Sequence, residues 1–317
     1  MAHTQDAKRR ADGPDRGTLA LLAVAGAVVT WGWSNVAIKA VSVTGLVASF
    51  WRLWIAIPFL WATALLAPGV RAALDRRWLV GSLVGGLLFG LHQWLFFTSL
   101  KATSVTDVSI IGSLQPALVL LVAGPMFGER VGATAIAWSV VALLGTALVV
   151  VGGHGLPGWS ARGDLLAALN LFVFTTYFLA SKRIREDVGA TAYVAGMTTV
   201  SGVVIALVCL ATGQDVGSPR PSDWPSLVGL ALVSGTLGHV LLNWAHPYAP
   251  AFVVSILLLG VPVLATAGAA MFLGEVPSVL QIVGGVLVLL SIACIVASTR
   301  ASVAEELAES AAETDAP

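Results

Sequence analysis

Charged residues are scarce in this chain, and their scarcity limits what the protein can be. Of 317 residues only 11% are charged, whereas soluble domains carry about 25%. Hydrophobic residues make up 57%, and the mean hydropathy is +0.89. One soluble core cannot bury so much apolar side chain, so we expect lipid to be the solvent. The formal net charge is zero, which gives no indication of nucleic-acid binding.

The chain has only two cysteines, and it lacks the common metal-binding spacings and nucleotide-binding motifs. Cys209 and Cys294 lie inside apolar runs, which favours small core residues over a disulfide or a metal pair. No HxxxH, CxxC or P-loop motif occurs, so we expect no metal, no cofactor and no ATP-driven pump. Residues 1–16 are polar and basic, which predicts that no signal peptide is removed.

Ten apolar segments have the length of about 20 residues that a membrane helix needs. Short loops join them and leave no room for a soluble domain. The sequence therefore predicts an all-α integral membrane protein with a cytoplasmic N-terminal segment (1–16) and an acidic, disordered cytoplasmic tail (300–317). The predicted spans are 17–38, 45–66, 78–99, 103–125, 132–152, 163–182, 190–212, 224–244, 249–272 and 277–298.

Basic residues are distributed unevenly between the loops, and this sets the predicted orientation. With both termini in the cytoplasm, twelve basic residues lie inside, and only Lys39, Lys101, Arg162 and Arg220 lie outside. The positive-inside rule favours this arrangement. We therefore expect a multi-pass protein of the cytoplasmic membrane with both termini inside. A monomer and a homodimer both stay open, because ten helices can enclose a site of their own.

The chain repeats itself once, without a gap, at an offset of 146 residues. Trp78 matches Trp224, and Pro116 matches Pro262. Each copy holds five predicted spans, and an odd number forces the two copies into opposite orientations. Inverted repeats are the architecture of many alternating-access transporters. The two predicted five-helix repeats are 17–153 and 163–299.

Four motifs resemble those of a known family: WGWSNVAIK (31–39), FWRL (50–53) and two runs from proline to Gly-Glu (114–131 and 261–276). From about residue 17 to 298 the sequence resembles the EamA-like, ten-helix branch of the drug/metabolite transporter superfamily. The resemblance implies a ten-helix fold and transport of amino acids, sugars, nucleotide precursors, drugs or metabolites. The second copy departs from the pattern, because no arginine matches Arg52.

The first span carries residues that predict a substrate cavity. Trp31 and Asn35 are spaced i, i+4, so they share one helix face, and their partners in the second copy are Tyr177 and Ser181. We expect an aromatic wall that stacks on a small-molecule substrate and polar groups that orient it. The alternative is that Trp31 belongs to an interfacial aromatic belt.

Histidines and amides on two other spans extend the predicted substrate site. His92 and Gln93 lie in the third span, while His239 and Asn243 share one face of the eighth. A histidine at membrane depth can relay a proton, or it can be a hydrogen-bonded packing residue. Both interpretations stay open, and a proton is a candidate coupling partner.

Two charges inside predicted spans are candidates for gating or coupling. Arg52 lies about 10 Å and Asp107 about 6 Å from the same end of the bundle, at 1.5 Å per residue. They could pair as an outer gate, or Asp107 could carry a coupling proton. Alternatively, Arg52 snorkels to headgroups and Asp107 caps its own helix. Lys39 and Arg185 are expected to be membrane-end anchors.

Pro116 and Pro262 fall in the middle of the fourth and ninth predicted spans. Each proline removes a backbone donor and frees the carbonyl four residues earlier. The resulting kink can be a hinge between inward and outward states, or a static kink that improves packing. The Gly-Glu pairs at 128–129 and 274–275 are predicted to be turns in which glycine ends one helix and glutamate opens the next.

These features predict a secondary transporter that exports an amino-acid-like or amphipathic metabolite by alternating access. Import or exchange is the alternative direction. A membrane-embedded enzyme would need clustered acid, base or nucleophilic groups, which the sequence does not show, so we expect no enzyme. A passive channel is a further alternative, which the tandem repeat and the mid-span prolines disfavour.

Overall fold

Helices account for most of the chain that the structure describes. The computed structural model describes residues 16–66, 74–119, 122, 133–154, 156, 158–217, 219–249, 251–291 and 293–294, and none of these forms a strand. Among these described residues, eight helices are long and apolar enough to cross a membrane. The chain is therefore an all-helical, multi-pass membrane protein. Three predicted features lie outside the described residues: the segment before Arg16, the Gly-Glu turn at 128–129 and the tail at 300–317.

Six long helices coincide with predicted spans, and no helix end differs from its prediction by more than one turn. Each of these helices is formed by a predominantly apolar segment of about 20 residues, the length needed to cross a membrane. They are α2 (Arg16–Ala40), α3 (Gly45–Leu66), α4 (Arg76–Ala102), α7 (Ala133–Gly153), α8 (Ala161–Ile184) and α9 (Ala190–Ala211).

Three other predicted spans are interrupted helices. In the fourth, α5 (Val105–Gly112) is followed by a turn at 113–114 and helical residues 115–119. In the ninth, a turn at 258–259 separates α12 (Ala251–Leu257) from α13 (Gly260–Phe272). The eighth consists of η1 (Pro221–Asp223), α10 (Trp224–Gly229), the π-helix η2 (Leu230–Gly238) and α11 (His239–Ala245).

Two apolar helices of the described chain are shorter than a full membrane span. They are Val105–Val119 and Val279–Ser291, and they stand where the fourth and tenth spans are predicted. The count of ten crossings therefore stays a prediction.

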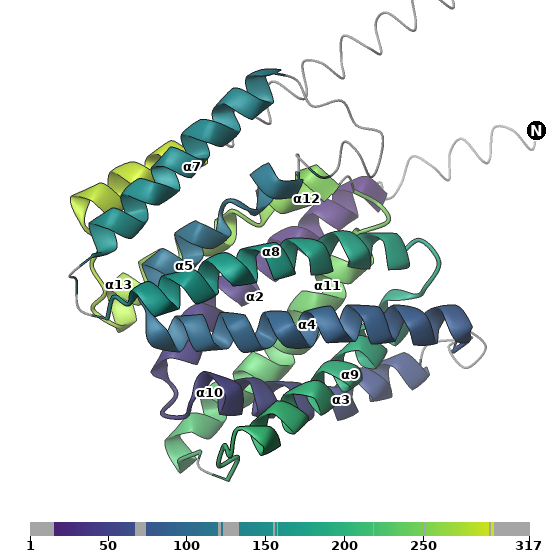
Figure 1. Cartoon of the computed structure of the whole chain (residues 1–317). Coiled ribbons are helices and arrows are strands. Elements are labelled where there is room, and N and C mark those ends of the chain that lie inside the picture. The colour runs from purple at the N-terminus through teal and green to yellow at the C-terminus, as the bar shows by residue number, and fades with distance from the viewer. Residues whose placement is uncertain are drawn as a thin grey trace, which may run out of the picture.

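Glycines allow the helices of the bundle to pack closely. The helix α4 runs along α8 and α9 (Figure 1). A Cβ atom added at Gly86 of α4 would lie 2.8 Å from the Met197 carbonyl oxygen of α9. At the edge of the bundle, a Cβ atom added at Gly145 of α7 would lie 2.8 Å from the Gly284 carbonyl oxygen in helix 279–291. Small residues at such contacts let backbones approach each other, which is a main source of helix association in membranes.

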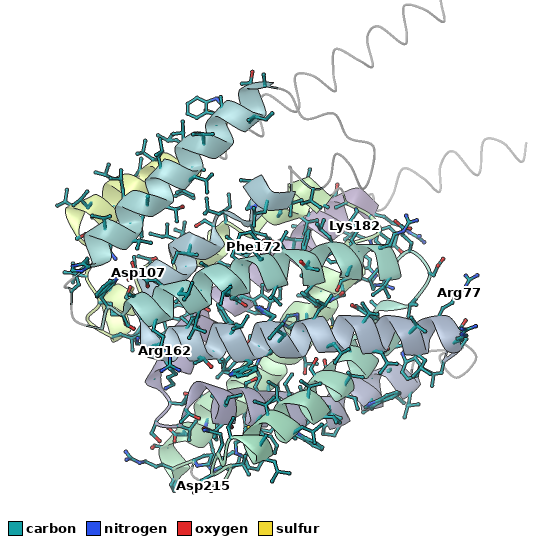
Figure 2. All side chains as sticks on the ribbon, in the orientation of Figure 1. Arg77, Asp107, Arg162, Phe172, Lys182 and Asp215 are labelled. Atoms are coloured by element: carbon teal, nitrogen blue, oxygen red, sulfur yellow. The ribbon has the colours of Figure 1, made fainter. Side chains whose placement is uncertain are left out.

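Thr103 and Arg77 mark the two opposite ends of the bundle. At the first, which we call the Thr103 end, Lys39 Nζ donates to the Thr103 carbonyl, and Ser160 N donates to Thr103 Oγ1 at 3.2 Å. There α2 and α4 finish and α8 begins, so α4 and α8 are antiparallel. Figure 2 shows Arg77, near the start of α4, at the opposite end, which we call the Arg77 end.

Candidate functional site

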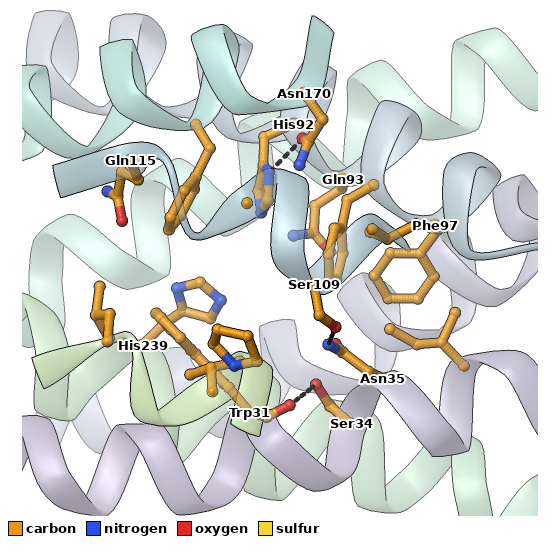
Figure 3. Close-up of a pocket in the computed structure, with 18 of the residues that line it drawn as sticks. Trp31, Ser34, Asn35, His92, Gln93, Phe97, Ser109, Gln115, Asn170 and His239 are labelled. Carbon is orange, nitrogen blue, oxygen red and sulfur yellow. Dashed lines mark hydrogen bonds between the residues drawn. The ribbon is translucent and has the colours of Figure 1, made fainter. Parts of the chain in front are cut away.

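A cavity lies between helices from both predicted repeats (Figure 3). It is displaced toward the Thr103 end, because its wall residues on α2 and α4 lie in the later parts of these helices. Aromatic and aliphatic side chains share its wall with nine polar or charged side chains, a mixture that suits a small molecule with apolar and polar parts. The wall residues are Trp31, Ser34, Asn35, Ile38, Arg52, His92, Gln93, Phe96, Phe97, Val108, Ser109, Gly112, Gln115, Asn170, Phe174, His239, Leu258, Val261 and Pro262.

Trp31 is fixed against the eighth span by the π-helix η2. Its indole Nε1 donates to the Ser234 carbonyl at 3.0 Å, and its ring lies 4.7 Å from the ring of His239, centroid to centroid. Gly238 makes this approach possible, because a Cβ atom there would lie 2.5 Å from Trp31 Nε1. Single π-helical segments often occur at functional sites. Here one positions two of the predicted substrate-binding residues.

Arg52 brings an isolated positive charge to the cavity wall. The residue is only 4% exposed. Its Nη1 donates to Gln93 Oε1, and its guanidinium carbon lies 5.8 Å and 5.7 Å from the ring centroids of Phe89 and Phe97. Within the described part of the chain, no carboxylate lies within 4.0 Å of this guanidinium. The side chain therefore does not snorkel to headgroups but stays inside the bundle.

Polar pairs connect the helices around the cavity (Figure 3). His92 Nδ1 lies 2.7 Å from Asn170 Oδ1, which joins α4 to α8, and the His92 ring packs 4.7 Å from that of Phe174. Asn35 Nδ2 donates to Ser109 Oγ at 3.4 Å, which joins α2 to α5. These bonds fix the orientation of both predicted polar residues.

Two buried polar atoms at the wall have no hydrogen-bond partner among the described residues. They are Gln115 Nε2 and His239 Nδ1, and both residues are almost completely buried. Buried polar groups are nearly always hydrogen-bonded, since an unpaired one destabilises the fold. Both side chains belong to the cavity wall, so the unsatisfied groups lie beside the cavity.

The structure places three predicted substrate-binding residues outside the cavity. Asn243 Nδ2 donates to Tyr177 Oη at 3.4 Å, and Ser181 Oγ lies 2.8 Å from Tyr193 Oη, so all three serve helix packing. The reason is geometric. Trp31 lies in the part of α2 near the Thr103 end, so the equivalent positions in an inverted copy lie near the Arg77 end. The cavity, in contrast, lies nearer the Thr103 end, so these positions do not reach it.

Some wall residues were not predicted from the sequence. Asn170 is an isolated amide in an apolar run, and Gln115 directly precedes a mid-span proline, so both carried a usable signal. Ser109, Phe96 and Phe174 carried none, because serine and phenylalanine are common throughout membrane helices.

Arg52 and Asp107 are not brought together as an ion pair. The Asp107 carboxylate accepts from Ser104 Oγ at 2.7 Å and from Gln281 Nε2 at 2.9 Å. Ser104 Oγ in turn accepts from Asp107 N at 3.0 Å, which caps the start of α5. Asp107 therefore takes part in a helix cap and in a contact with helix 279–291, and it does not line the cavity.

Lys39 and Glu275 form a polar junction at the Thr103 end. Lys39 Nζ lies 3.7 Å from Glu275 Oε1, while Glu275 Oε2 accepts from Val105 N at 2.7 Å. Gly274 has a φ of 69°, the left-handed conformation that commonly ends a helix. Glycine thus ends α13 as predicted, but the glutamate caps the neighbouring α5 instead of the helix that follows it.

Arg185, the counterpart of Lys39 in the second copy, is also held inside the bundle. It follows the last residue of α8, is buried, and donates through Nε to the Asn243 carbonyl at 2.8 Å. Burial lowers the pKa of Arg185 to about 10, so it keeps its charge at neutral pH. Carbonyl groups at helix ends therefore bind both basic residues that were expected to anchor in lipid.

The two mid-span prolines follow the two helix breaks. The turn at 113–114 precedes Pro116, and the turn at 258–259 precedes Pro262. Pro262 and Gly112 line the cavity, whereas Pro116 does not. The breaks therefore bring irregular backbone to the wall, which membrane helices tolerate only where it is buried or lines a cavity.

A multi-pass helical bundle that encloses a cavity of aromatic and polar side chains has the architecture of membrane proteins that handle small solutes. The sequence matches the EamA-like transporter family over residues 18–151 and again over 161–297. The chain belongs to this family and is a membrane transporter.

Similar proteins include several named exporters. The aromatic amino acid exporter YddG of Ancylobacter novellus is 30% identical over 224 residues, which cover 67% of this chain and 74% of that protein. The "Probable terminal-alkyne amino-acid exporter" of Streptantibioticus cattleyicolor is 30% identical over 269 residues, covering 82% and 87%. A solved crystal structure of a protein 20% identical to this one has the same fold, with a TM-score of 0.70 over 90% of this chain and 99% of that one.

Proposed function

We propose that this chain is a secondary active transporter that exports a small amino-acid-like or amphipathic metabolite across the cytoplasmic membrane by alternating access. The observation that carries the proposal is the pair of helix breaks at 113–114 and 258–259. When the first break is shifted by 146 residues it overlaps the second, which supports two repeats with matching breaks. Both breaks flank the cavity. Broken helices at a substrate site are the usual means by which transporters combine binding with movement.

The names of similar proteins support the direction and the class of solute. YddG is named for export of aromatic amino acids, and the relative from Streptantibioticus for export of an amino acid. The aromatic wall suits such solutes. Import or exchange is the alternative direction. The proposal includes ten crossings, both termini in the cytoplasm, a proton as the coupling ion, and a monomer or homodimer.

The experiment compares metabolites inside and outside cells that express the unmodified chain or Gly112→Trp. Gly112 lines the cavity, and no atom lies within 4 Å of a Cβ atom added there, so the indole would fill the cavity. Gly229→Trp is the matched control, because this glycine also has open space but does not line the cavity. We expect one or more compounds to accumulate outside with the unmodified chain and with the control only.

Three other outcomes separate the alternatives. Accumulation inside the cells would favour import. Flux that rises without saturation as the internal concentration rises would favour a passive channel. Equal distributions with all three proteins would contradict transport through this cavity.

A further inference from the structure

The charge at the cavity wall indicates what the solute must carry. We infer that Arg52 binds a carboxylate of the solute, and that the solute is a carboxylic acid with a flat apolar side chain, such as an aromatic amino acid. This inference rests on the proposed function, since it assigns a solute to the same cavity.

The first step of the argument concerns charge. Among the wall residues of the described chain, Arg52 alone carries a formal charge, and none is acidic. A buried cation without an anion is unfavourable, because the bundle does not replace the solvation that water provides. An anionic group in the cavity would neutralise it. A simple amine would instead meet an unopposed positive charge.

The second step concerns the geometry of the guanidinium. One nitrogen, Nη1, is held by Gln93, and the rings of Phe89 and Phe97 pack against the group. These contacts fix a planar group whose fork of N–H donors matches a carboxylate. Gln93 is an amide and therefore restrains the guanidinium without neutralising it. The charge remains available to a solute.

The third step concerns the remainder of the wall. Trp31, Phe96 and Phe174 supply aromatic surface for a flat side chain. The Gln115 and His239 side chains also line the cavity. An amide N–H donates to a carboxylate oxygen, and a neutral imidazole accepts from an ammonium group. A zwitterionic amino acid would use both kinds of group and neutralise Arg52, whereas an uncharged solute would leave that charge unopposed.

The test measures binding of four probes that share a phenylethyl group to the purified full-length protein. Two probes carry a carboxylate, L-phenylalanine and 3-phenylpropanoate, and two lack it, L-phenylalaninamide and phenethylamine. We expect the carboxylates to bind at least about tenfold more tightly. Arg52→Gln should weaken carboxylate binding by about 10- to 100-fold and should not weaken binding of the amide, whose ammonium group no longer meets the Arg52 charge. Arg183→Gln is the control, because its side chain is 70% exposed on the surface of the bundle.

Arg52→Lys keeps the charge without the planar fork, so it should retain an intermediate preference for carboxylates. If Arg52→Gln does not fold, Arg52→Lys takes its place in the binding test. Equal binding of acid and amide by the unmodified protein, or equal loss of both in the Arg52 variants, overturns the inference and leaves Arg52 as a packing residue. Binding of none of the four probes overturns it as well. The metabolite comparison with Gly112→Trp then decides separately whether the chain exports anything.

Discussion

At the scale of single residues, the bond between His92 and Asn170 is the clearest test of the cavity wall. Asn170→Ala would leave His92 Nδ1 buried without the partner that now lies 2.7 Å away. We expect this change to lower the free energy of unfolding by about 1–3 kcal/mol. Thermal unfolding in detergent measures the effect.

The matched control for Asn170→Ala is an amide on the surface. Gln214 Oε1 accepts from Thr44 Oγ1 at 2.7 Å in an exposed position, so Gln214→Ala should change stability by no more than about 0.5 kcal/mol. If both variants shift the unfolding temperature equally, the His92–Asn170 bond has no special weight in the wall.

Residue type predicted which polar side chains are buried, but not which of them face the cavity. Arg52 and His92 could be predicted, because a charged or polar residue inside an apolar run should face the bundle interior. Whether it then faces a cavity or another helix depends on small rotations that hydropathy does not encode. Asn170 and Asn243 illustrate this: both are buried amides, yet only Asn170 lines the cavity.

At the scale of elements, the π-helix η2 should be sensitive to one methyl group at Gly238. Gly238→Ala would place Cβ 2.5 Å from Trp31 Nε1, so the indole must move and its bond to the Ser234 carbonyl is strained or lost. We expect a loss of about 1–3 kcal/mol in stability, as for other overpacked sites. Transport in reconstituted vesicles should fall with it.

Gly229→Ala provides the comparison for Gly238→Ala within the same interrupted span. No atom lies within 4 Å of a Cβ atom added at Gly229. Alanine favours a helix over glycine by up to about 1 kcal/mol, so this variant should be as stable as the unmodified protein or slightly more. A loss of transport in Gly229→Ala equal to that in Gly238→Ala would show that the contact with Trp31 is not the cause.

The break before α13 should affect the rate of the transport cycle. Pro262→Ala restores a backbone donor and allows α12 and α13 to join into a straighter helix. If the break is a hinge, the maximal transport rate should fall severalfold while the KM changes less than about twofold. Initial rates in vesicles over a range of solute concentrations separate the two parameters.

Pro58→Ala is the matched control for the hinge, because Pro58 lies inside α3 at an exposed position. It should leave the rate of transport unchanged. An unchanged maximal rate in Pro262→Ala would mean that the break is a static feature of packing.

Helix lengths followed from the sequence, but helix interruptions followed only in part. Predominantly apolar runs predicted α3 and α9 to within one residue at each end, because the membrane itself fixes the length. The prolines indicated the breaks at 113–114 and 258–259. Nothing in the sequence indicated η2. Its wider π-helical turns accommodate Trp31 and Arg52, which belong to other helices. Such contacts arise only in the assembled bundle, so they cannot be predicted from the local sequence.

At the scale of the whole molecule, alternating access requires the Thr103 end to open at some stage. There the ion pair between Lys39 and Glu275 joins α2 to the segment after α13, and Glu275 also caps α5. We expect this junction to break when the cavity opens on that side. Under the proposed orientation, the Thr103 end faces the outside of the cell.

A cysteine placed in the cavity can report this opening. The chain has only two native cysteines, so a Cys209→Ala, Cys294→Ala background is readily made, and Ser109→Cys then supplies one thiol at the wall. Glu275→Gln removes the charge that holds Lys39. We expect it to increase labelling of Ser109→Cys severalfold when an impermeant maleimide is added outside intact cells. Labelling is read by mass spectrometry or by a shift on a gel.

Asp187→Asn is the matched control, because it removes an ion pair at the opposite end, where Asp187 lies 3.8 Å from Arg77. It should leave outside labelling unchanged, since that pair is exposed and weak. If Asp187→Asn increases outside labelling and Glu275→Gln does not, the Arg77 end faces outward and the proposed orientation is reversed. If neither variant changes labelling, the junction between Lys39 and Glu275 does not restrain the cavity, and access at that end must depend on apolar contacts instead.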